Sequence, residues 1–218
     1  MPLQKEEITR KLLHFFALLM PAGIYYIPRM DYPVAIPIGI LALLLGGSIL
    51  IEWLRFRSKT VQKLFFTYFG SMLRSEEKTK TTGSTYVIAA SLLCAILFRN
   101  HLHIAFIVLS LFILGDGIAA IAGLSLGRIK IGKKSLEGSI ACFALCLLLI
   151  YGVFPFLPGI LDSWGNRVPL IFALIISFSI TILELFPIKI NSRLTFNDNL
   201  AVPVITGYVV LALEKILL

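Results

Sequence analysis

Residues 104–122 read IAFIVLSLFILGDGIAAIA, and this stretch decides the class of the fold. It carries one charged residue, Asp116, and it approaches the length of about 20 residues that an apolar helix needs to cross a bilayer. The whole chain of 218 residues is 58% hydrophobic and 15% charged, with a mean hydropathy of +0.91. A soluble domain of this size buries only part of its surface. We therefore expect lipid to cover much of the apolar surface.

Apolar stretches on both sides of residues 104–122 predict further transmembrane helices. Three are long and strongly apolar (33–54, 138–157 and 168–186), and three are shorter or less apolar (12–27, 86–98 and 201–218). A signal peptide is the alternative for residues 12–27, but no small-residue cleavage site precedes the next stretch. The sequence thus predicts an all-α, polytopic integral membrane protein with about seven transmembrane helices in a single domain, residues 1–218.

Basic residues divide the loops into two kinds. The net charge of +8 comes from 20 Lys and Arg against 12 Asp and Glu, and in so apolar a chain it indicates cytoplasmic loops rather than nucleic-acid binding. The basic segments are 1–11, 55–83, 126–137 and 189–199, whereas the alternate loops hold few Lys or Arg. The positive-inside rule then predicts a cytoplasmic N-terminus and an exported C-terminus.

The loop 55–83 also contains an amphipathic segment. Apolar residues recur at helical spacing between 61 and 74, with Lys63, Thr67 and Arg74 on the opposite side. This pattern predicts a helix lying in the cytoplasmic membrane interface. A short helix packed on its own protein is the alternative.

Four polar clusters fall on the predicted cytoplasmic side, and the first is Arg10, Lys11 and His14. Their spacing places them on one helix face at the mouth of the first span. They are candidates for the site, and membrane-anchoring charges are the alternative.

The second cluster lies in residues 115–139, GDGIAAIAGLSLGRIKIGKKSLEGS. A carboxylate inside an apolar helix is costly, so Asp116 is a functional candidate. A stripe of small residues leads from it to Lys133, Lys134 and a polar run, and the stripe and run comprise Ala119, Gly123, Gly127, Ser135, Glu137, Gly138 and Ser139. Glycines followed by lysines and hydroxyls suit a polyphosphate, whereas helix packing is the alternative for the stripe. The P-loop pattern does not occur.

The third and fourth clusters supply oxygen ligands. Glu184 lies near the inner end of the stretch 168–186, and Asn197-Asp198-Asn199 leads into the last span. Carboxylates and amides suit Mg²⁺, which takes one or two protein carboxylates together with substrate phosphates. A turn or helix cap is the alternative for the Asn-Asp-Asn run.

With these motifs, the chain resembles the CTP-dependent dolichol, phytol and related polyprenol kinases, a group related to CTP-dependent diacylglycerol kinase. Matching elements cover most of the chain, and the most specific is the run from Asp116 through Gly123 and Gly127 to Lys133-Lys134-Ser135-x-Glu137-Gly138. The others are residues 10–14 (RKLLH), Leu73-Arg74 with Glu76 and Glu77, residues 82–85 (TGST), residues 184–187 and residues 197–200 (NDNL).

The resemblance implies transfer of the γ-phosphoryl group of CTP to the hydroxyl of a membrane-dissolved lipid alcohol, with Mg²⁺ or another divalent cation. Lysines 133 and 134 would hold phosphates, as would Arg10, Lys11 and Arg74. Asp116 and Asp198 would serve as metal ligand and alcohol-activating base, in either order. Glu137 and Glu184 would orient lysines or bind a second cation.

The size of the chain bears on the substrate and the membrane. It lacks the extra N-terminal spans expected of eukaryotic dolichol kinases. We therefore expect a smaller isoprenoid alcohol or diacylglycerol, and a prokaryotic inner membrane with the site facing the cytoplasm. The sequence leaves the oligomeric state open and is compatible with a homo-oligomer.

Two other functions compete with a kinase. A CTP:phosphatidate cytidylyltransferase would also join CTP to lipid on this face, but it would release pyrophosphate and leave a CDP-lipid. A small ion-coupled transporter would use Asp116 and Glu184 as interior ion ligands. It would leave the cytoplasmic lysines without a role, and the sequence lacks the inverted repeat common in transporters.

Overall fold

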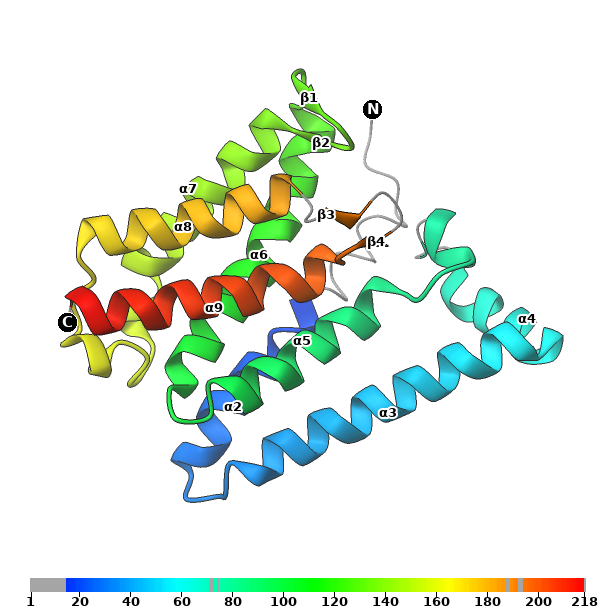
Figure 1. Ribbon diagram of the computed structural model, residues 1–218, viewed down its shortest axis with the longest axis horizontal. Helices are drawn as coiled ribbons and strands as arrows, with labels where there is room; N and C mark the ends of the chain where they lie inside the picture. Colours follow the sequence, from blue (N-terminus) through cyan, green and yellow to red (C-terminus); the bar gives the residue numbers. More distant parts are fainter. Residues whose placement is uncertain (1–14, 71–72, 74, 187–188, 192–193, 218) are drawn as a thin grey trace.

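The computed structural model describes residues 15–70, 73, 75–186, 189–191 and 194–217 (Figure 1). The larger helices of this part are α2 (Leu19–Arg29), α3 (Ala35–Arg57), α4 (Lys59–Phe69), α5 (Gly83–Leu97), α6 (Leu102–Ser125), α7 (Leu136–Gly152), α8 (Leu170–Leu185) and α9 (Asp198–Leu217). Short 3₁₀ turns are η2 (Ser75–Lys78), η3 (Phe154–Phe156) and η4 (Asp162–Trp164). The predicted all-α class is confirmed.

Two small antiparallel hairpins interrupt the helices. Strands β1 (Lys130–Ile131) and β2 (Lys134–Ser135) pair between α6 and α7, with Gly132 at a φ of +61° in the turn. Strands β3 (Lys189–Asn191) and β4 (Leu194–Thr195) pair between α8 and α9. Both hairpins lie at the same end of the bundle, where α6 ends and α9 begins (Figure 1).

Helix α6 is the centre of the molecule. Every residue from His103 to Ile113 is buried, and α6 packs against α2, α7 and α9. A helix that is apolar on all sides is expected in a buried position. The stretch that decides the class of the fold therefore also forms its core.

Helices α3, α6, α7 with η3, and α9 provide four segments that are long and apolar enough to cross a membrane: Ala35–Arg57, Leu102–Ser125, Leu136–Phe156 and Asp198–Ile216. Three of them match long stretches expected from the sequence. The fourth expected one, 168–186, is only the 16-residue helix α8, because Pro169 precedes the helix and Pro187 disfavours helical backbone at Phe186. Helix α5 is also short, with 15 residues.

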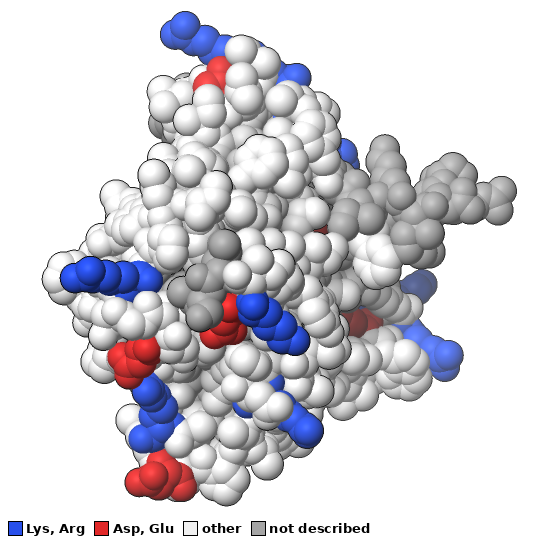
Figure 2. All heavy atoms as spheres, turned by 60° about the vertical axis from the view of Figure 1, so that its left-hand side comes forward, with Lys and Arg blue, Asp and Glu red and all other residues white. Residues whose placement is uncertain are grey.

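The outer surface of the bundle is apolar. Helix α3, which runs along the lower edge in Figure 1, exposes Leu43 (79%), Ile49 (54%) and Leu50 (54%). In Figure 2, charged side chains gather in the lower half and at the top of the visible face, and most of the surface between them is uncharged. This arrangement fits an integral membrane protein.

The predicted amphipathic helix forms, but it ends earlier than expected, at Phe69. Helix α4 exposes Leu64, Tyr68 and Phe69, as a helix in the membrane interface would. Its Phe65 ring packs against the guanidinium of Arg55 on α3, at 4.7 Å. One part of the apolar face thus packs on the protein, and the interfacial position of the rest stays a prediction.

Candidate functional site

Lys134 meets acidic groups from two other segments at the hairpin end of the bundle. Its ammonium lies 3.0 Å from Glu184 Oε1, near the end of α8, and 3.1 Å from Asp198 Oδ2, in the first turn of α9. It also donates to the backbone carbonyl of Glu184. The sequence selects these residues in three separate motifs, and the structure brings the three together.

Asp116, on α6, is the third acid near Lys134. Its charge acts on both Lys134 and Glu184. Burial lowers the pKa of Lys134, but the three carboxylates outweigh burial and raise this pKa above its ordinary value. Lys134 is therefore an ammonium at neutral pH. We call Lys134, Glu184, Asp198 and Asp116 the acid–lysine cluster.

The acid–lysine cluster has the donor chemistry of a divalent-cation site. The Glu184 side chain is buried, and its Oε2 atom has no hydrogen-bond partner in the part of the chain that the structure describes. A buried carboxylate oxygen without a partner is unfavourable, and Mg²⁺ prefers such oxygens as ligands. Glu184 Oε2 is therefore an oxygen donor of the kind that a divalent cation takes, and Mg²⁺ binding by Asp116, Glu184 and Asp198 stays a prediction.

Asn197 and Asn199 hold the start of α9 beside this cluster. The Asn199 backbone amide donates to Asn197 Oδ1 and to Asp198 Oδ1, each at 3.0 Å. Asn199 Nδ2 donates to the Gly83 carbonyl at 3.1 Å, at the start of α5. Asn197 therefore forms a turn, as the alternative for this run expects, whereas Asn199 links the start of α9 to the start of α5. Their role as metal ligands stays a prediction.

The glycine stripe of α6 packs against the β1–β2 hairpin and the start of α7. A Cβ added to Gly138 would lie 2.5 Å from the Ala119 carbonyl oxygen, and one added to Gly123 would lie 2.8 Å from Ser135 Oγ. Ser135 caps α7 beside them, because its Oγ accepts a hydrogen bond from the Gly138 amide at 3.2 Å. These contacts support the packing alternative for the stripe.

Lys133 and Glu137 lie outside the buried cluster, in the β1–β2 hairpin and in the first turn of α7, respectively. Lys133 is exposed in the turn between β1 and β2. Glu137 Oε1 accepts hydrogen bonds from the backbone amides of Arg128 and Ile129, at 2.9 and 3.1 Å. Glu137 thus fixes the backbone at residues 128 and 129, directly before β1. The exposed side chain of Lys133 is accessible to an anion from solution.

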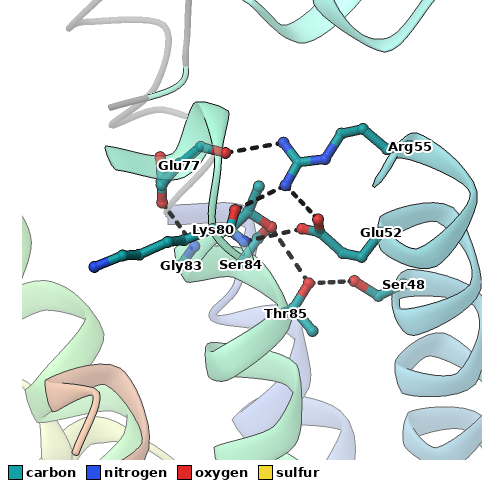
Figure 3. Close-up of polar contacts among 9 residues, drawn as sticks. Ser48, Glu52, Arg55, Glu77, Lys80, Gly83, Ser84 and Thr85 are labelled. Atoms are coloured by element: carbon teal, nitrogen blue, oxygen red, sulfur yellow. Dashed lines mark hydrogen bonds and ion pairs between the residues drawn. The ribbon is translucent and has the colours of Figure 1, made fainter. Parts of the chain in front are cut away.

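A second buried ion pair, Glu52 with Arg55, lies near the end of α3 (Figure 3). The two residues are 7% and 1% exposed. Arg55 also donates to the backbone carbonyls of Glu77 and Lys80, at 3.0 and 2.8 Å. Glu52 Oε1 accepts from the Thr82 amide at 2.9 Å. The pair therefore fixes the segment that leads into α5.

Glu77 connects this pair to the acid–lysine cluster. Its Oε1 accepts a hydrogen bond from the Gly83 amide at 2.7 Å, at the positive end of α5 (Figure 3). The Gly83 carbonyl in turn accepts from Asn199, the neighbour of Asp198. Polar contacts thus run from Arg55 through the start of α5 to the start of α9.

Glu52 and Arg55 are candidates that the sequence motifs do not include. Arg55 counts among the basic loop residues, and Glu52 falls within the expected span 33–54. The signal that points to them is an acid inside an apolar helix, three residues before an arginine. Four residues that the sequence assigns to the site, Arg10, Lys11, His14 and Arg74, lie outside the described residues.

Comparison with known proteins finds distant relatives. No protein-family model and no solved structure matches the chain significantly. An uncharacterized protein of Rickettsia prowazekii is 24% identical over 201 residues, which cover 90% of this chain and 89% of that protein. A probable chloroplastic phytol kinase of Glycine max is 31% identical over 130 residues, which cover 57% of this chain but only 41% of the relative. The chain is therefore a distant, partial homologue of a probable phytol kinase, which suggests the polyprenol and phytol kinase family.

Proposed function

We propose that this protein is a membrane kinase that transfers the γ-phosphoryl group of CTP to the hydroxyl of a lipid alcohol. The observation that carries the proposal is the acid–lysine cluster at one end of an apolar bundle, in a distant relative of a probable phytol kinase. The bilayer would supply the alcohol, and solution at the hairpin end would supply the nucleotide.

Phosphoryl transfer requires positioning, charge neutralisation and removal of one proton. A Mg²⁺ ion held by the acid–lysine cluster would neutralise charge on the phosphates. One of the two aspartates, 116 or 198, accepts the proton of the alcohol hydroxyl as its oxygen bonds to the γ-phosphorus. The bond between that phosphorus and the β,γ-bridging oxygen breaks, and CDP leaves. Lys134 is already positioned by Glu184 and Asp198, and Lys133 lies beside it on the exposed hairpin.

An assay with two positions of the radiolabel tests the function. We expect purified protein in detergent or nanodiscs to move label from γ-labelled CTP to a lipid alcohol, and no label from α-labelled CTP. Farnesol, phytol, a longer polyprenol and diacylglycerol form the substrate panel, and labelled ATP tests the nucleotide. Label moving from α-labelled CTP, with release of pyrophosphate, would identify a cytidylyltransferase instead. Absence of both products, together with ion flux in vesicles, would favour the transporter.

The two hairpin lysines provide a prediction about nucleotide binding. We expect Lys133→Met and Lys134→Met each to raise the KM for the nucleotide without raising that for the alcohol. A charge-assisted hydrogen bond to phosphate contributes about 1.5–3 kcal/mol, which corresponds to about 10–150-fold in affinity. Steady-state kinetics against each substrate measures the effect, with circular dichroism as the folding control. Normal nucleotide kinetics in both variants and in the double variant would contradict the phosphate-binding role.

The side of the membrane that the β1–β2 hairpin faces is a separate prediction. Positive-inside sorting places the hairpin in the cytoplasm and the α7–α8 connection outside. In a background without Cys94, Cys142 and Cys146, we expect Lys133→Cys to react with an impermeant thiol reagent only in inverted vesicles. Asp162→Cys, also at an exposed position, should react only in whole cells or right-side-out vesicles. The opposite pattern would reverse the topology and place the site outside.

A further inference from the structure

Two histidines and a glutamate meet at the opposite end of the bundle from the acid–lysine cluster. His101 precedes α6, His103 lies in its first turn, and Glu214 lies near the end of α9. His103 Nε2 is 3.0 Å from Glu214 Oε1, and His101 Nδ1 is 3.3 Å from Glu214 Oε2. At ~1.5 Å per residue, His103 lies about 20 Å from Asp116 along α6, and Glu214 lies about 24 Å from Asp198 along α9. This cluster is therefore separate from the proposed kinase site.

The spacing of these atoms suits a shared metal ion. One ligand atom from each of the three residues lies within 4.8 Å of the others. Tetrahedral ligands at ~2.0–2.1 Å from a zinc ion lie about 3.3 Å from one another. The contacts that His103 and His101 make with the two separate oxygens of Glu214, at 3.0 and 3.3 Å, are close to this spacing. Glu214 Oε2 has no hydrogen-bond partner among the described residues, although His101 Nδ1 is near. These two atoms converge without the alignment of a hydrogen bond.

The surroundings hold the ligands in place and leave one side open. Trp164 Nε1 donates to Glu214 Oε1 at 3.3 Å, and the Trp164 ring meets the His103 ring edge-on, with 5.7 Å between centroids. Such outer contacts orient metal ligands. The side chains of His103 and Glu214 are 9% and 16% exposed, whereas that of His101 is 41% exposed. A cation can therefore enter from the His101 side.

One cation near the cluster opposes metal binding. The charge of Arg29 acts on His103. However, Arg29 lies 3.4 Å from Asp162 and donates to the Tyr25 hydroxyl, so its charge is partly balanced. Glu214 supplies a further negative charge directly at the histidines. The local charge balance therefore allows a divalent cation.

We propose that His101, His103 and Glu214 form a binding site for a divalent transition-metal cation of the Zn²⁺ class. Imidazole nitrogens select zinc and related metals over Mg²⁺ and Ca²⁺, which prefer oxygen ligands. Three protein ligands with an open fourth position are the usual number for an accessible zinc site. The bound ion fastens the start of α6 to the end of α9, the two helices that also reach the acid–lysine cluster.

Zinc binding by the full-length protein in detergent tests this site. Metal is first removed with a chelator, and the protein is then incubated with zinc and freed of excess. We expect elemental analysis to find about one Zn²⁺ per chain. We also expect zinc, but not Mg²⁺, to raise the thermal-unfolding midpoint. His103→Gln and Glu214→Gln should weaken zinc binding at least about tenfold and abolish the thermal shift. Co²⁺ in place of zinc should give the visible spectrum of a four-coordinate site, and the same variants should lose it.

Three further variants make the test independent of folding. His101→Gln changes the most exposed ligand, so we expect it to fold normally and still bind zinc at least about tenfold more weakly. Trp164→Phe keeps most of the ring but removes the hydrogen bond to Glu214, and it should weaken binding by about tenfold. Asp31→Asn is the control, because Asp31 is an exposed acid at the same end, with a φ of +63° that asparagine tolerates. Zinc binding equal in wild type and His101→Gln, or no stoichiometric zinc in wild type, would leave only a hydrogen-bonded cluster and overturn the proposal.

Discussion

Replacing Asp116 or Asp198 by asparagine is expected to reduce the kinase activity by at least about 100-fold, while the protein still inserts and purifies. Asparagine preserves the size of the side chain and most of its hydrogen bonding. It removes the negative charge, which a general base requires and a Mg²⁺ ligand supplies. Loss of a general base alone lowers rates by about 10²–10⁴-fold. The turnover number measured at saturating nucleotide and alcohol checks the prediction.

Metal dependence separates the two roles of these acids. Raising Mg²⁺ or substituting Mn²⁺ should partly restore a variant that has lost a metal ligand, but not one that has lost the base. Asp162→Asn is the matched control, because this acid is exposed at the other end of the bundle and should leave turnover unchanged. Near-normal turnover of Asp116→Asn would make the acid on α6 structural. The catalytic assignment would then pass to Glu184 and Asp198, which contact Lys134 directly.

Replacing Arg55 by methionine is expected to lower the free energy of unfolding by about 3–5 kcal/mol. The change leaves the Glu52 carboxylate buried without its cation, and it removes the donor from the carbonyls of Glu77 and Lys80. Reversible unfolding in mixed detergent micelles measures the effect. Arg57→Met is the matched control, since Arg57 lies on the same helix but is exposed, and it should change stability by less than about 0.5 kcal/mol.

A double variant tests whether the buried pair itself carries the effect. Glu52→Met combined with Arg55→Met removes both charges, so it should be less destabilised than Arg55→Met alone. The single variant should also lose activity, because the segment held by Arg55 leads through Gly83 to Asn199 beside the acid–lysine cluster. Wild-type stability of Arg55→Met would show that the pair contributes little to the fold.

The lengths of the helices show which features local sequence patterns predict and which they do not. Apolar length predicts the central helix and the long helices α3 and α7 well, because a run of apolar residues is a local property. The stretch 168–186 is equally apolar, yet its helix has only 16 residues between two prolines. Conversely, residues 201–218 are less apolar, but the helix begins at Asp198 and reaches spanning length. Caps and prolines set these ends, and mean hydropathy does not register them.

The sequence by itself determined the all-α membrane class and the motifs that carry the candidate chemistry. Charge sorting and motif position also predicted that Lys134, Glu184 and Asp198 would share one end of the molecule. Only the tertiary structure decided that Lys134 contacts both acids, since those contacts join residues 50 and 64 positions apart. It also buried Glu52 and Arg55, and it brought His103 into contact with Glu214, which lies 111 positions away in the sequence. Such pairs depend on how helices pack, and helix packing brings together side chains that no local pattern relates.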